Sequence, residues 1–191
     1  MAGLDLVTAP ADEPVTLEAA KLHLRVEADD EDSMIAVYLA AARNHVETFL
    51  KSSLLETAWR YRIDGGFPWE IRLPIGPVLT ADGLAITYVD DAGATQTLDP
   101  SVYKVALGET GIIRPAYSQV WPFSRRESDA VTVAFKAGWP NAAAVPQGIV
   151  AAVLLMTGHL YQNREATAAA GAAMELPLGV RNLLMPFVRN D

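Results

Sequence analysis

The fold is decided by residues 31–63, EDSMIAVYLAAARNHVETFLKSSLLETAWRYRI, because the apolar pattern changes its period within this stretch. From residue 31 to 51 the apolar side chains recur every three or four residues, which is typical of an amphipathic helix. From residue 57 to 63 they alternate with polar neighbours, which is typical of a half-buried strand. The helix carries its stripe on Ile35, Tyr38, Leu39, Ala42, Val46, Phe49 and Leu50, and the strand on Thr57, Trp59, Tyr61 and Ile63.

On the N-terminal side, the sequence predicts one short helix preceded by an extended arm. Pro10 and Pro14 mark the arm, and Thr16 is a suitable N-cap for a helix over residues 17–24. Acidic residues follow at 27–32, at the start of the long helix, where negative charge complements the helix dipole.

On the C-terminal side, the pattern predicts a run of short strands and then helices again. Pro146 suits the first turn of a second long helix, which continues from Ile149 to about Arg164. An Ala/Gly linker over 166–173 leads to a short helix over 178–185, which Pro186 ends. The further strands are predicted at residues 69–73, 84–88, 95–98, 103–105, 111–114 and 131–135.

This order of elements predicts an α+β fold, a helical bundle of two long and two short helices with an inserted small antiparallel β subdomain. The expected parts are the N-terminal arm and bundle helices over 1–55, the β subdomain over 56–138, the second long helix over 139–165, and a linker with a C-terminal segment over 166–191.

Composition excludes several classes of protein. With 191 residues, 51% hydrophobic and 20% charged, the chain can bury a core. A formal net charge of −8 argues against binding nucleic acid through the overall field. No cysteine is present, so disulfides and thiol catalysis are excluded. The N-terminus lacks a signal-peptide pattern, and the apolar run at 149–158 is too short to span a bilayer, so we expect a cytoplasmic protein without a membrane span.

No pattern points to a catalytic, cofactor-binding or metal-binding residue. His23, His45 and His159 lie far apart in the sequence, and the acidic residues at 27–32 do not match a calcium loop. Phosphate-loop and nucleophile-elbow motifs are missing, and the paired carboxylates of Asp90–Asp91 lie in a predicted turn.

Four tryptophans lie within or beside the predicted β region. Large aromatic side chains either fill a core or anchor an interface, and the sequence leaves both interpretations open. These residues are Trp59, Trp69, Trp121 and Trp139.

Several short motifs occur in a recognisable order along the chain. They are LEAAKLHLRV (17–26) with AAARNHVE (40–47), LPIGPV (73–78) with LDPSVYKV (98–105), and VPQGI (145–149) with GHLYQNRE (158–165) and LPLGVRNLL (176–184). Together they resemble the head–tail connector, or adaptor, family of long-tailed phages and gene transfer agents. The β portion is longer than in the small all-helical connectors.

The resemblance implies a structural virion protein without catalysis or cofactor. Its subunits are expected to form a ring, usually a dodecamer, between the portal and the tail in the neck of a particle assembled in the host cytoplasm. Expected partners are the portal protein, further copies of the chain, and a tail-side neck, stopper or terminator protein. DNA would pass through the lumen without specific binding, which suits an acidic protein.

The resemblance also implies that the C-terminal segment embraces the portal, which we carry onto residues 165–191. An apolar peptide after a mobile linker is expected to become ordered only against a partner, so that deleting residues from Ala166 onward would leave the fold intact. The alternative is a tail packed on its own bundle. The expected portal-contacting residues are Leu176, Leu178, Val180, Arg181, Leu183, Leu184, Met185, Phe187 and Val188.

Three other functions remain open at this point. One is a different neck or tail-completion protein of a phage-like particle. Another is an enzyme that uses carboxylates of the β subdomain. The third is a monomeric binding module whose exposed tryptophans hold a peptide or a sugar.

Overall fold

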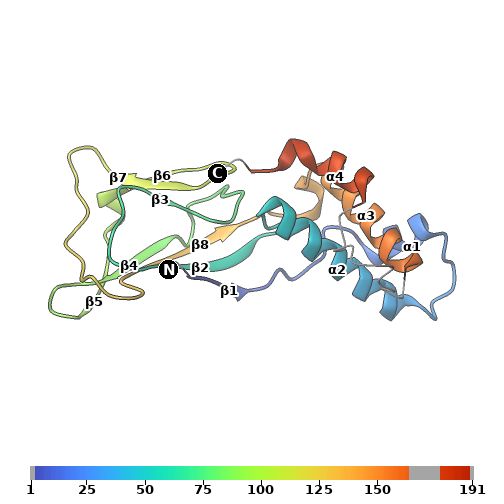
Figure 1. The fold of residues 1–191 in the computed structure, drawn as a ribbon, viewed down its shortest axis with the longest axis horizontal. Helices are drawn as coiled ribbons and strands as arrows, with labels where there is room; N and C mark the ends of the chain where they lie inside the picture. The colour runs from blue at the N-terminus through green and yellow to red at the C-terminus, as the bar shows by residue number, and fades with distance from the viewer. Residues whose placement is uncertain (1–2, 164–176, 190–191) are drawn as a thin grey trace, which may run out of the picture. The chain divides into compact units, whose positions relative to one another are not determined.

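A computed structural model describes residues 3–163 and 177–189. The chain divides into two units, each formed by two separate parts of the sequence (Figure 1). The β unit contains residues 1–11 and 56–139, and the helical unit contains residues 12–55 and 140–191. The α+β class predicted from the sequence is therefore confirmed, and residues 56–139 of the β unit lie between α2 and α3 in the sequence.

The helical unit contains α1 (Leu17–Leu24), α2 (Asp32–Leu50), α3 (Gln147–Gln162) and α4 (Leu178–Leu184). Thr16 caps α1 as predicted, because its side-chain oxygen accepts a hydrogen bond from the amide of Ala19. The left-handed residues Arg25 and Lys51 end α1 and α2, and the amide of each donates to carbonyls of the preceding turn.

The core of the helical unit follows the apolar stripe of α2. Five residues of the predicted stripe are buried, whereas Tyr38 and Phe49 are half-buried at its margins. Helix α3 packs against α2 and α4 packs against α3, so that α3 is covered on more than one side. The buried side chains are Ile35, Leu39, Ala42, Val46 and Leu50 of α2, Ile149, Ala152, Val153 and Met156 of α3, and Val180 and Leu184 of α4.

The β unit contains two antiparallel sheets. The larger has strand order β1-β2-β8-β4-β5 and the smaller β3-β7-β6. The strands are β1 (Gly3–Thr8), β2 (Thr57–Ile63), β3 (Ile71–Arg72), β4 (Ala85–Val89), β5 (Thr95–Thr97), β6 (Tyr103–Ala106), β7 (Ile112–Pro115) and β8 (Val131–Ala137).

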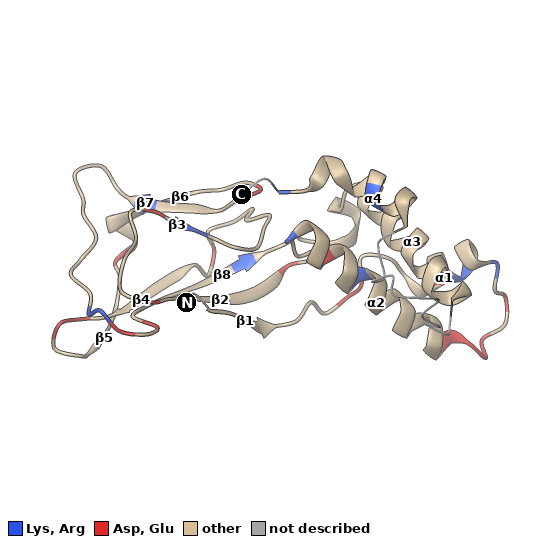
Figure 2. Ribbon diagram, viewed as in Figure 1, with Lys and Arg blue, Asp and Glu red and all other residues tan. Residues whose placement is uncertain are grey.

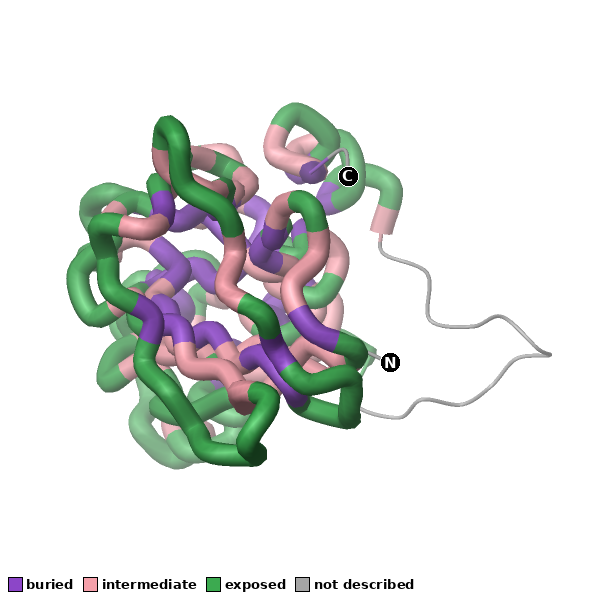
Figure 3. The backbone as a smooth tube through the Cα atoms, turned by 90° about the vertical axis from the view of Figure 1, so that its left-hand side faces the viewer, coloured by how far each residue is buried: buried purple, intermediate pink, exposed green. Residues whose placement is uncertain are grey.

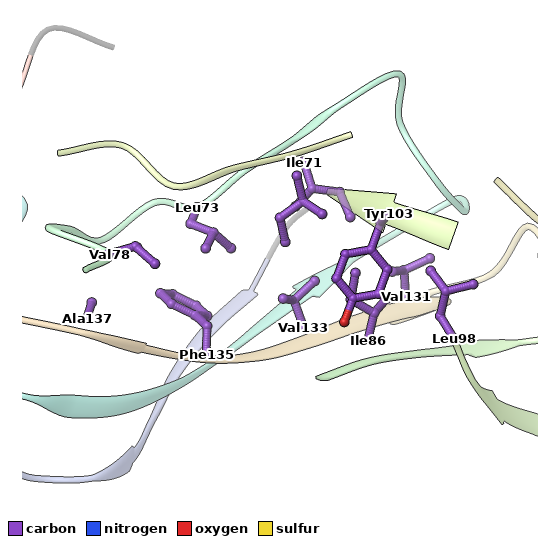
Figure 4. Packing of buried hydrophobic residues seen from close by; sticks show 11 residues of the cluster. Ile71, Leu73, Val78, Ile86, Leu98, Tyr103, Val131, Val133, Phe135 and Ala137 are labelled. Atoms are coloured by element: carbon purple, nitrogen blue, oxygen red, sulfur yellow. The ribbon is translucent and has the colours of Figure 1, made fainter. Parts of the chain in front are cut away.

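The core of the β unit lies between these two sheets. Alternate residues of β8 are buried, from Val131 to Ala137, and their side chains point toward those of Ile71, Leu73 and Tyr103 (Figure 4). Gly111 is buried beside Leu73 and Val78, where its missing side chain allows a close approach. In Figure 3 the exposed stretches follow the loops, which agrees with a core formed by the strands.

One strand of the β unit was not predicted from the sequence. Residues 3–8, interpreted as an arm of the helical part, form β1 and pair with β2. The strand is weakly amphipathic, since residues 6–8 are exposed, and its partner residues lie fifty or more positions away in the sequence. An ion pair between Asp5 and Arg62, with a 2.9 Å separation of Oδ2 and Nε, joins β1 to β2 across the sheet.

Candidate interaction surfaces

The described residues contain no group of histidine and acidic side chains that is suited to hold a metal ion. The acidic segment, defined as residues 27–32, instead forms side-chain contacts with α1 and α3. The ammonium group of Lys21 in α1 lies 2.6 Å from a carboxylate oxygen of both Asp29 and Asp32. The hydrogen bond from Lys21 lowers the pKa of Asp29. Glu31 accepts a hydrogen bond from the hydroxyl of Tyr161 in α3.

The C-terminal residues predicted to contact a portal are divided between the core and the surface. Val180 and Leu184 are buried against the helical unit, and Leu183, Phe187 and Val188 are half-buried. Leu178, Arg181 and Met185 are exposed. Leu176 and the predicted linker over 166–173 lie outside the described residues.

The described part of this tail packs on its own helical unit. The ring of Phe187 packs against Gly148 of α3. An idealised Cβ at Gly148 would lie 3.0 Å from a ring carbon of Phe187. Arg189 is buried and donates a hydrogen bond of 3.0 Å from Nη1 to the carbonyl of Lys51. The structure therefore favours the alternative of a packed tail over an apolar peptide that orders only against a partner. Deletion from Ala166 onward would remove α4 from α3, so the expectation that it leaves the fold intact stays a prediction to be tested.

A second surface lies on the β unit, where apolar side chains of two loops are exposed. A cavity of about 380 Å³ is lined there by Trp69, Arg114, Pro115, Ala116, Gln119, Val120 and Trp121. We call these residues, together with Tyr117 and Phe123, the aromatic surface. Tyr117 and Phe123 of the same loop are also exposed.

Ring stacking and one hydrogen bond hold the aromatic surface in place. The rings of Trp121 and Phe67 stack with centroids 4.9 Å apart and an interplanar angle of 10°. The indole Nε1 of Trp121 donates to the backbone oxygen of Trp69 over 3.3 Å. These contacts link the two loops, so the aromatic surface is preorganised in the absence of a partner.

The four tryptophans have different roles. Trp59 and Trp121 are half-buried and pack against the core of the β unit, as the core interpretation predicts. Trp139 is half-buried at the end of the β unit. Trp69 is 85% exposed and agrees with the interface interpretation instead.

A shared carboxylate organises the charges beside the cavity. Glu70 lies 2.6 Å from Nη2 of Arg114 and 2.6 Å from Nε of Arg72. The hydrogen bond from Arg114, followed by that from Arg72, lowers the pKa of Glu70. Two cations and one anion leave this group with a net charge of about +1 at neutral pH.

Comparison with known proteins gives a consistent result. Residues 14–94 match the family described as phage gp6-like head-tail connector protein. This segment begins before α1 and ends in the turn after β4, so it includes both the first helices and the start of the β unit. Over this segment the chain is similar to the head–tail connector family.

Solved structures of gene transfer agent particles contain chains with a similar fold. A chain from the neck of an empty particle, computed with C6 symmetry, is 23% identical with a TM-score of 0.79, covering 99% of this chain and 96% of that one. A chain from the virion of a native particle is 24% identical with a TM-score of 0.79 over 98% and 96%. A neck chain computed with C12 symmetry is 23% identical with a TM-score of 0.70 over 99% and 96%. No curated protein sequence matches at a significant level.

The aromatic surface was not predicted as a site from the sequence. Its residues are Trp69 and residues of the stretch 114–123, which are separated in the sequence and meet through the pairing of β3 with β7. The available signal was the number of apolar residues in AYSQVWPF (116–123), a stretch that has no strand or helix period.

Proposed function

We propose that the chain is a structural subunit of the ring that joins the head of a phage-like particle to its tail, and that it performs no catalysis. The observation that carries this proposal is the match to head–tail connectors over residues 14–94, together with a fold shared over nearly the full length of neck proteins. A neck chain described with twelvefold symmetry supports a dodecamer as the expected ring.

In this role the chain contacts a portal on one side and a tail-side neck protein on the other, and DNA passes through the lumen. The net charge of −8 supports a conduit, because like charge keeps the duplex from adhering to the protein. Within the described residues, no helix combines the length and the apolarity that crossing a bilayer requires.

The portal-facing part of the proposal rests on the exposed side of α4. Val180 and Leu184 attach this helix to α3, which leaves Leu178, Arg181 and Met185 exposed to a partner. Two apolar side chains beside a cation are a suitable contact set, since interface cores favour apolar groups and arginine.

The direct test is assembly with the portal ring of the same particle. We expect native mass spectrometry of the purified mixture to show a portal with a fixed number of bound copies, and electron microscopy to place them at the neck. A chain that stays monomeric in the presence of portal rings would contradict the proposed function.

Surface variants then test the docking residues. Leu178→Ser with Met185→Ser should weaken portal binding while the circular dichroism spectrum is unchanged. A matched control is Leu107→Ser, since Leu107 is a half-exposed leucine of the β unit. Equal portal binding by both variants would assign docking to another surface.

A further inference from the structure

The aromatic surface exposes several large apolar side chains to solvent. Trp69 is 85% exposed, Val120 79% and Phe123 73%. Contiguous exposed apolar side chains mark interaction sites, and tryptophan and arginine are enriched among the residues that dominate binding energy. The stack of Phe67 on Trp121 keeps the surface in one arrangement, so little ordering cost remains when a partner binds.

The charge of the aromatic surface narrows the choice of partner. Arg114 lines the cavity, and its side chain is 56% exposed even while it pairs with Glu70. With Arg72 on the same carboxylate, this corner of an otherwise acidic chain is positive. A fitting partner therefore presents apolar side chains beside negative charge.

Such a surface exists on the chain itself, on the outer side of α2. Residues 33–42 include no charged side chain, although several of them are exposed. Met34 and Val37 lie one turn apart on this side and are 46% and 60% exposed. A solvated helix face normally carries charges, so an uncharged exposed face indicates a missing partner.

The acidic segment lies directly before this face of α2 (Figure 2). Lys21 pairs with Asp29 and Asp32, but the segment has five acidic residues, so its charge remains strongly negative. Glu27 and Asp30 are exposed. The outer face of α2 thus combines apolar side chains with negative charge, the complement of the aromatic surface.

We propose that the aromatic surface of one copy docks on the outer face of α2 of the next copy, with Arg114 toward the acidic segment. The inference rests on the proposed function and names the contact between neighbours in the ring. The two surfaces belong to different units of the chain, so the contact is heterologous. Repeating such a contact closes a ring when the rotation between copies is suitable.

The chain contains no cysteine, so single cysteines can report this contact without background. Val37→Cys and Val120→Cys are placed in separate chains, which are mixed and assembled on the portal ring. A short bismaleimide is then added. As a matched control, Thr95→Cys, an exposed position on β5, replaces Val120→Cys. We expect a crosslinked dimer in the first mixture and much less in the control.

Each outcome has a distinct meaning because the ring is first verified by native mass. A complete ring with no crosslink above the control overturns the proposed contact and leaves the proposed function intact. A crosslink from Val120→Cys to the portal protein overturns it as well, because the portal then covers the aromatic surface. If no ring forms on the portal, the proposed function fails and the contact fails with it.

A second measurement does not depend on crosslinking geometry. Val37→Asp places a charge on the outer face of α2 and should weaken assembly of neighbouring copies by about tenfold or more, the size expected for a central interface residue. Thr95→Asp is the control and should assemble like the wild type. Equal assembly by both variants, with unchanged circular dichroism, would overturn the proposed contact.

Discussion

Arg43 and Glu47 form an ion pair one turn apart on α2, with 2.7 Å between Nη1 and Oε2. The second oxygen of Glu47 accepts the amide of Leu54 at 2.8 Å, so this carboxylate also fixes the chain after the helix ends. Arg43 reaches Glu13 as well, over 2.8 Å, and thereby joins the segment before α1 to α2. Glu47 is mostly buried, and its burial raises the pKa of the carboxyl despite these donors.

The raised pKa of Glu47 predicts a specific pH dependence of stability. Ionisation is harder in the folded chain than in the unfolded chain, whose glutamate has an ordinary pKa of 4.5. The folded state therefore loses stability from Glu47 as pH rises through 4.5 to the raised value. We expect the unfolding free energy of the wild type to fall, relative to that of Glu47→Gln, as the pH rises across this range. Urea denaturation at several pH values measures it, and a flat difference would contradict the raised pKa.

Glu70 should show the opposite slope. Arg114 and Arg72 lower its pKa, so the carboxylate stabilises the fold above the ordinary value of 4.5, and this contribution is lost as pH falls below it. The advantage of wild type over Glu70→Gln should shrink as the pH is lowered. Added salt should reduce it too, because both arginines are more than half exposed. Urea denaturation of the wild type and of Glu70→Gln at several pH values, with and without added salt, measures this difference in unfolding free energy.

A side chain at Gly111 should destabilise the β unit. An added Cβ would lie 2.8 Å from both Leu73 Cδ1 and Val78 Cγ2, atoms of the buried core. Gly111→Ala is therefore expected to lower stability by about 1–3 kcal/mol, the usual cost of overpacking. Gly179→Ala in α4 is the control, since nothing lies within 4 Å of its Cβ position, and it should leave stability unchanged or slightly raise it. Thermal unfolding distinguishes the two, and similar melting temperatures would contradict the close packing.

The sequence predicted the elements whose pattern is local. Helix α2 and strand β2 were identified because each has an apolar side with the period of its own secondary structure. The predicted start of α1 agrees with the structure because Thr16 supplies a local start signal. Strand β1 was missed because its pairing with β2 is non-local and its exposed residues give only a weak alternation.

The interaction surfaces were harder to predict for the same reason. An apolar peptide such as 176–188 has one composition whether it packs on its own helices or on a partner, and the burial of Val180 within the helical unit could be established only from the structure. The cavity beside Trp69 depends on β3 meeting β7, a pairing across about forty residues of sequence. The spacing of apolar residues within one segment gives no information about such a long-range pairing of strands.

The packing of α4 gives a final prediction. Leu184 is fully buried against the helical unit, whereas Leu178 on the same helix is 74% exposed. Leu184→Ala should lower the free energy of unfolding by about 2–5 kcal/mol through lost burial and a cavity. Leu178→Ala should change it by less than about 0.5 kcal/mol, as for other exposed positions.

The two alanine variants should separate folding from docking. Urea denaturation of the purified chain gives the stability effect, and binding to portal rings gives the docking effect. Leu178→Ala should reduce portal binding without lowering stability, because it removes an exposed apolar contact and leaves the core complete. If instead both leucines proved equally dispensable for stability, α4 would not be packed on α3 in solution. The C-terminal segment would then order only on its partner, as first expected from its sequence.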